Sequence, residues 1–156
     1  MNPYTQGALH HIHVAISSIL QIMEQLDETE LSFRPTPDKH SIGELLEHLS
    51  LICLADVHIG DGASEPFMAE FYVQHQLNQL HEMKQALHQN YEALRVRYLA
   101  YTENELSENI TAYWGVTYTR YEWLLEILTH LYHHRGQLHA ILVHTLHHDP
   151  KIALFE

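Results

Sequence analysis

Apolar residues recur at helical spacing through most of this sequence, and glycine and proline interrupt them in only a few places. Stripes with a period near 3.6 residues are typical of amphipathic helices that bury one face. No convincing long strand pattern occurs between the stripes. The spacing therefore predicts an all-α fold, a four-helix bundle with an irregular link before the last long helix. A chain of 156 residues suits a single domain, so we expect residues 1–156 to form one helical-bundle domain.

Capping signals place the boundaries of the four long helices. Ser41 with Glu44, and Thr119 with Glu122, form capping boxes that open the second and fourth helices. Asp149-Pro150 is a stop signal for the last helix. The expected helices run from about 4 to 28, from 41 to about 60, from about 68 or 74 to 100, and from 119 to 148. The link before the last helix contains two β-favouring patches and room for a short helix at 103–108.

Composition excludes several classes of partner. The net charge is −12 and the eight Lys and Arg residues are scattered, which argues against nucleic acids and anionic membranes. No apolar run reaches the length of a membrane span. Cys53 is the only cysteine, so no intramolecular disulfide can form, and the N-terminus lacks a secretory pattern. We therefore expect a cytoplasmic protein.

Histidine is abundant, with 16 residues in the chain and four of them in the stretch THLYHHRGQLH at 129–139. Two imidazoles can share a metal ion when they lie one helical turn apart, as in the pairs His130/His134 and His144/His148. Random placement of so many histidines would produce about as many such pairs. The spacing alone therefore identifies no metal site, and the helix face of each histidine must decide.

The helix face favours one pair. On the last helix His130 and His134 flank the apolar stripe, whereas His133 points nearly opposite to it. His48 occupies a similar margin on the second helix, so three imidazoles can meet in one cleft and leave an open coordination position. The alternative is that these are packing histidines without a ligand. His10 and His13 are open to two interpretations, as further residues of the cleft or as surface residues.

Three neighbours of these histidines also invite interpretation. Gly136 in mid-helix indicates a close approach of another helix. Arg135 and Gln137 are placed to position a substrate or the second nitrogen of a ligand, although a structural hydrogen bond explains each equally well. Glu44 lies one turn before His48 and could orient it, but its capping role already accounts for it.

Three segments resemble the DinB/YfiT-like superfamily of metal-dependent four-helix proteins. They are FRPTPDKHSIGELLEHL at 33–49, the link YWGVTYTRYEWL and HLYHHRGQL at 130–138, in the family's order over essentially the whole chain. The motif H-x-x-x-H-R-G-Q is the most specific. One departure is His40, at a position where such proteins often have tryptophan.

The resemblance implies a site and a class of activity. The family's metal ligands fall on His48, His130 and His134, the trio that the helix faces favour. The implied cofactor is a divalent transition metal, zinc or nickel first, with iron, manganese or copper open. The implied function is transfer of a low-molecular-weight thiol, such as bacillithiol or mycothiol, to a small electrophile. Alternatives are a metal-dependent hydrolase, a non-catalytic metal-binding or stress-related bundle, and a plain bundle with incidental histidines. No catalytic residue can be assigned.

Apolar residues outside the four stripes predict an interface. Five of them gather in the link and the tail, namely Tyr113, Trp114, Ile152, Leu154 and Phe155. An exposed apolar patch of this kind usually marks a contact surface, and relatives are often dimers, so we expect a two-fold homodimer. The tail either docks on its own bundle or reaches the partner. Trp123 either covers the metal cleft or joins the dimer contact.

Overall fold

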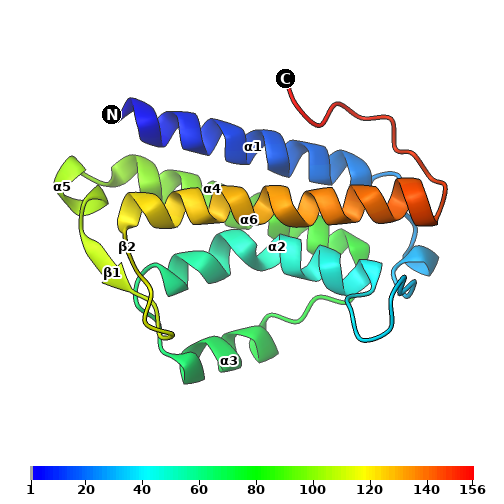
Figure 1. Cartoon of the computed structure of the whole chain (residues 1–156), viewed down its shortest axis with the longest axis horizontal. Coiled ribbons are helices and arrows are strands. Elements are labelled where there is room, and N and C mark those ends of the chain that lie inside the picture. The colour runs from blue at the N-terminus through cyan, green and yellow to red at the C-terminus, as the bar shows by residue number, and fades with distance from the viewer. Residues whose placement is uncertain (1) are drawn as a thin grey trace.

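A bundle of four long helices dominates the computed structural model, which describes residues 2–156 (Figure 1). Helix α1 packs against α4 and α6, and α2 packs against the same two helices, so the four close around the main apolar core. These helices are α1 (Pro3–Met23), α2 (Ile42–Ile59), α4 (Leu80–Ala100) and α6 (Arg120–Ala140). The predicted all-α four-helix bundle is confirmed. Among the described residues, no helix is both long and apolar enough to cross a membrane.

Smaller elements fill the connections between the long helices. They are the 3₁₀ turn η1 (Glu28–Glu30), α3 (Glu65–Gln74), α5 (Glu103–Leu106), strands β1 (Asn109–Thr111) and β2 (Thr117–Thr119), and the π-helical segment η2 (Ile141–Thr145). Strands β1 and β2 pair antiparallel and form a short hairpin. The short helix predicted at 103–108 is therefore present as one turn, and the two β-favouring patches of the link pair with each other.

Both capping boxes open helices as predicted. The Ser41 hydroxyl accepts from the Glu44 amide at 3.2 Å, and the Glu44 carboxylate accepts from the Ser41 amide at 2.8 Å. Thr119 and Glu122 exchange the same two bonds at 3.2 and 2.7 Å. Each box satisfies amide groups that the first turn of a helix leaves without partners. The starts of α2 and α6 are therefore determined locally.

Two helix boundaries differ from the prediction. Helix α1 ends at Met23 rather than near 28, because Asp27 and Glu30 make a capping box of their own and begin the separate turn η1. The single helix expected up to residue 100 is two helices, because Ser64 caps α3 and Glu82 accepts from the Gln79 amide at the start of α4. Polar side chains that compete for backbone amides thus divide both apolar patterns.

The last helix changes its geometry before it ends. After Ala140 the backbone widens into a π-helical segment, in which the Leu146 amide donates to the Ile141 carbonyl at 3.1 Å. Its predicted end at His148 is too late, because His147 has a φ of 53° that a right-handed helix cannot accommodate. Residues of this π-helical segment line a cavity that is described below.

The hairpin packs over the start of α6 and fixes Trp123. The Trp123 ring is buried, its Nε1 donates to the Ile110 carbonyl at 3.2 Å, and its ring centroid lies 5.0 Å from that of Tyr118. Gly115 has a φ of 95°, which its turn requires. Within the chain, Trp123 supports the hairpin, a role that differs from the two considered for it, as a cover of the metal cleft or as part of a dimer contact. Tyr113 and Trp114 at the hairpin tip are exposed, as expected.

The C-terminal tail folds back along the bundle toward the N-terminal half of α1 (Figure 1). Arg135 donates to the Leu154 carbonyl at 2.7 Å, Gln25 donates to the Pro150 carbonyl at 2.9 Å, and Glu156 pairs with His10 at 2.9 Å. Phe155 remains 68% exposed beside Tyr132. Of the two predicted arrangements, the tail therefore adopts the one in which it docks on its own bundle.

Candidate metal centre

Helices α2 and α6 bring His48, His130 and His134 together. Each of the three offers one ring nitrogen, and these nitrogens all lie within 4.8 Å of one another. His48 comes from the middle of α2, whereas His130 and His134 lie one turn apart on α6. All three side chains are half-buried at the margin of the core. The residues predicted from helix faces thus meet in space, from positions 82 residues apart in the sequence.

Hydrogen bonds hold two of the rings in one orientation. The His130 Nδ1 donates to the Asp56 carboxylate at 2.8 Å, and the His134 Nδ1 donates to the Gln137 side-chain oxygen at 2.7 Å. Carboxylate and amide oxygens are acceptors, so Nδ1 carries a proton in both rings, and each ring in its neutral form presents the lone pair of Nε2. Support of this kind behind metal-ligating histidines fixes the tautomer and the ring direction.

The spacing of the nitrogens suits a shared cation. The Nε2 atoms of His48 and His130 are 3.0 Å apart. Nitrogens bound to a tetrahedral zinc at ~2.0–2.1 Å lie about 3.3 Å from each other. Three imidazoles leave one position of a tetrahedral ion open. The donor set therefore fits a divalent transition metal with room for one exogenous ligand.

Electrostatics keep two of the imidazoles neutral and favour the charged form of the third. Burial, together with the positive charges of protonated neighbours, lowers the pKa of His48 to about 4. Burial is also the main cause that lowers the pKa of His134. For His130 burial acts in the same direction, but the hydrogen bond and charge of Asp56 outweigh it and raise its pKa. Asp56 thus supplies the negative charge that a cation at this site requires.

Asp56 is the residue that sequence analysis missed. It lies on α2 two turns after His48 and is 8% exposed, in the apolar stretch LICLADV. A carboxylate is rarely buried without a partner, so an acidic residue in an apolar stripe was the available signal. Its partner, His130, lies 74 residues later, which is why spacing could not reveal the pair.

The other residues considered from the sequence fall into separate roles. Gln137 holds the Nδ1 of His134, which agrees with one of the two roles proposed for it. Arg135 is buried and donates to Ser18 and to the tail, so its role is structural. The interpretation of Gly136 as a close helix contact was wrong, because a Cβ added there would meet nothing within 4 Å. His10 and His13 are exposed on α1 and bond to Glu156 and Ser17 rather than to the trio.

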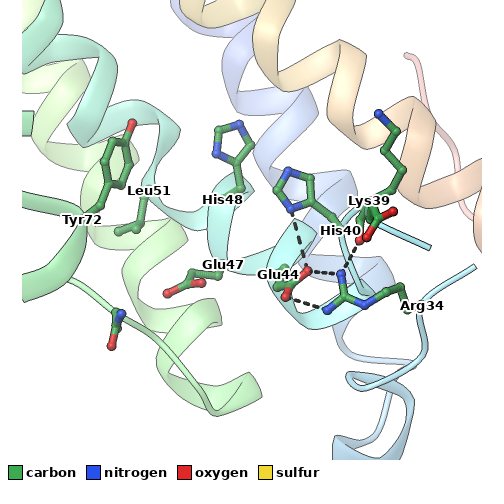
Figure 2. Close-up of a pocket in the computed structure, with 10 residues that line it drawn as sticks. Arg34, Lys39, His40, Glu44, Glu47, His48, Leu51 and Tyr72 are labelled. Carbon is green, nitrogen blue, oxygen red and sulfur yellow. Dashed lines mark hydrogen bonds and ion pairs between the residues drawn. The ribbon is translucent and has the colours of Figure 1, made fainter. Parts of the chain in front are cut away.

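A polar cavity of about 650 Å³ opens beside His48 (Figure 2). Its walls include Arg34, Glu44, Glu47 and Tyr72. Glu44 is held by a two-bond contact with Arg34 at 2.7 and 2.8 Å, which is the main reason that its pKa falls to about 2. Glu47 accepts from the Leu77 amide at 2.8 Å. Both carboxylates thus already have partners, and Glu44 does not orient His48.

Tyr72 and His40 line the polar cavity on opposite sides of His48 (Figure 2). Burial and then the nearby Asp56 charge raise the pKa of Tyr72 to about 12, so its hydroxyl stays protonated and can donate. The His40 ring lies nearly parallel to the His48 ring, with ring centroids 6.1 Å apart.

Comparisons with known proteins place these features in one family. A model of the DinB superfamily matches residues 11–138. A crystal structure of a DinB family member from Exiguobacterium sibiricum 255-15 is similar over 99% of both chains, with 32% identity and a TM-score of 0.86. The mycothiol-dependent maleylpyruvate isomerase is similar in fold, with 14% identity, a TM-score of 0.70, and coverage of 88% of this chain and 63% of that one. No protein of curated function matches in sequence. The chain belongs to the DinB superfamily.

Proposed function

We propose that this protein is a metal-dependent enzyme that transfers a low-molecular-weight thiol to a small electrophile. The observation that carries the proposal is the trio of His48, His130 and His134, with two rings held by Asp56 and Gln137, at the edge of a polar cavity. A structural zinc site is usually closed by four protein ligands. A trio with an open position beside a cavity favours catalysis over a purely structural role.

The chemistry requires deprotonation of a thiol near neutral pH. His48, His130 and His134 would hold a divalent ion, which when bound would supply the Lewis acidity that lowers the pKa of a thiol beside it. The sulfur then bonds to the electrophilic carbon, the thiol proton passes to solvent, and the leaving group departs with its bonding electrons. Asp56 keeps the His130 ring oriented, Gln137 does the same for His134, and the protonated Tyr72 offers a donor at the cavity wall.

The fold relative with a mycothiol-dependent name supports a thiol as co-substrate, although its likeness concerns the fold. Hydrolysis would use a water molecule and a carboxylate base. The three carboxylates near the trio, Asp56, Glu44 and Glu47, all have hydrogen-bond partners. Thiol transfer therefore remains the first candidate, ahead of hydrolysis and of a non-catalytic metal-binding bundle.

Thiol consumption tests the proposal directly. Untagged protein loaded with Zn²⁺ or Ni²⁺ is mixed with monochlorobimane and, in separate reactions, bacillithiol, mycothiol, cysteine or glutathione. We expect at least one thiol to react faster with the loaded protein than with the metal-free protein or the His134→Ala variant. A loaded His133→Ala variant, as the matched control, should accelerate the reaction as the native protein does. If the protein binds metal stoichiometrically but accelerates none of these thiol reactions, the proposed enzymatic function is wrong and the protein is a metal-binding bundle.

Metal binding should depend on pH, because only neutral imidazole binds a metal. In the metal-free protein the raised pKa of His130 makes it the first of the trio to gain a proton as pH falls, and bound metal opposes that step. We expect metal to be lost as pH falls below about 6, near the ordinary imidazole pKa. Metal content after dialysis against a chelator at several pH values checks this. Full retention at about pH 4.5 would contradict a site built from histidines.

We also propose a homodimer. Because the tail docks on its own bundle, we assign the contact to exposed apolar residues of the hairpin and α3, namely Phe67, Val73, Tyr113, Trp114 and Tyr118. Sedimentation equilibrium at micromolar concentration should give twice the 18.2 kDa chain mass. Trp114→Ser should shift that mass toward the monomer, whereas the exposed Phe155→Ser in the tail should leave it unchanged. A monomer with the native sequence would end the proposal.

A further inference from the structure

We infer that a second, apolar cavity beside the histidine trio holds the hydrophobic group of a small-molecule substrate. The inference rests on the proposed function for the identity of the ligand as a substrate, but the binding site itself can be tested without metal. The cavity has a volume of about 640 Å³, within the usual range for small-molecule sites.

Apolar surface from four parts of the chain forms this cavity. The loop before α2 contributes Pro35 and Thr36, α2 contributes Leu45, and the end of α6 contributes Ala140 and the following Ile141. Thr145, at the end of the π-helical segment, completes the wall. Carboxylates are absent from its lining within the described part of the chain, in contrast to the polar cavity with Glu44 and Glu47.

The apolar cavity reaches the trio through shared residues. Lys39 and His40 line both cavities, and His40 stacks on His48. On the other side, Gln137 lines the apolar cavity and holds the Nδ1 of His134 at 2.7 Å. Figure 2 shows His40 and Lys39 on the opposite side of His48 from Tyr72. A ligand in the apolar cavity would therefore contact His40 and Gln137, which themselves contact the rings of His48 and His134.

The π-helical segment explains why α6 presents a wall here. Each π turn contains about one residue more than an α turn, which rotates the following side chains relative to a regular helix. Ile141, His144 and Thr145 all lie in this segment and all line the cavity. Such segments are less stable than α-helix and occur frequently at functional sites. Its coincidence with the cavity favours a binding role over an accidental surface hollow.

The two cavities differ in polarity, which assigns a substrate to each. The polar cavity, with Arg34, Glu47 and Tyr72, suits a thiol co-substrate that carries charged or hydroxyl groups. The apolar cavity suits an electrophile with a short alkyl or aryl group, and Lys39 at the junction offers a positive charge to an acidic or carbonyl group next to it. The substrate class is therefore an electrophile that carries an apolar alkyl or aryl group.

The first test measures the cavity in metal-free protein. 1-Butanol, 1-pentanol and 1-hexanol are titrated against protein with ¹³C-labelled isoleucine methyl groups. We expect saturable shifts of the Ile141 methyl signal, with affinity rising roughly two- to four-fold per methylene. Ala140→Trp fills the cavity from an exposed position and should remove this binding. If that variant does not fold, Thr36→Trp fills the cavity from the opposite wall and should have the same effect. Gln76→Trp in the polar cavity is the matched control and should retain it.

The second test asks whether the cavity serves the trio. In Zn²⁺-loaded protein, hexanohydroxamate should bind more tightly than acetohydroxamate, and Ala140→Trp should remove the gain from chain length while leaving acetohydroxamate binding intact. No saturable Ile141 shift in the first test overturns the inference. Equal binding of both hydroxamates overturns the link to the trio. Alcohol binding without any stoichiometric metal would instead overturn the proposed function alone and leave the apolar site standing.

Discussion

Replacing His134 with alanine is expected to abolish stoichiometric metal binding, whereas the neighbouring His133→Ala variant should bind metal like the native protein. The two side chains are separated by ~100° around α6. His134 is half-buried with its Nδ1 held by Gln137, and its ring lies 4.5 Å from that of His48. His133 is exposed to solvent. Removal of His134 leaves two nitrogens, too few to hold an ion against dilution.

Elemental analysis of untagged protein after gel filtration measures this difference, and circular dichroism verifies that both variants fold. Because each variant removes one histidine, the two proteins keep the same total number of histidines. Equal loss of metal from both would show that the face assignment of the α6 histidines is wrong. Retention of one metal per chain by His134→Ala would remove it from the ligand set.

Replacing Asp56 is expected to weaken metal binding about 10- to 100-fold, the usual effect of a residue that supports a ligand. Asp56→Asn keeps an oxygen that can accept from His130 Nδ1, but it removes the charge, so its effect should lie near the lower end of that range. Asp56→Ala removes the acceptor as well and should lie near the upper end. Competition with a chromophoric chelator measures both affinities.

Glu126→Gln provides the matched control for Asp56. Glu126 lies on α6 one turn before His130, is exposed, and also acts on the His130 charge, but without a hydrogen bond to the ring. Its replacement should change metal affinity less than two-fold. Asp56→Asn should also lower the pKa of His130 in the metal-free protein, visible as a shift in its NMR titration. If an Asp56 variant binds metal with native affinity and the pKa of His130 does not change, Asp56 has no influence on the site.

The starts of the helices could be predicted from the sequence because capping is local. Ser41 with Glu44 and Thr119 with Glu122 identify two starts within four residues. The ends were less predictable. Helix α1 ends early because Asp27 caps the separate turn that follows it. Helix α6 continues as a π-helical segment, which no residue type in the sequence predicts.

The candidate site also has features that the sequence predicts and features that it does not. Helical periodicity predicts that His130 and His134 share a face and that His133 points elsewhere, which the structure bears out in the arrangement of these side chains. The Asp56–His130 contact and the apolar cavity depend on how α2, α6 and the loop at 35–40 meet. Contacts between distant segments leave no periodic trace in a single sequence, so both emerged only from the three-dimensional arrangement.

The three histidines lie on two different helices, so metal binding would also affect the stability of the fold. Cys53 is the only cysteine in the sequence, so no disulfide can form within the chain. An ion held by His48 and His130 would close a loop of 82 residues, the kind of long loop whose closure restricts an unfolded chain most. The free energy of unfolding would then rise with the logarithm of the free metal concentration once that concentration exceeds the dissociation constant. Resistance to heat and to proteases would rise with it. Metal limitation would weaken the protein itself as well as its chemistry.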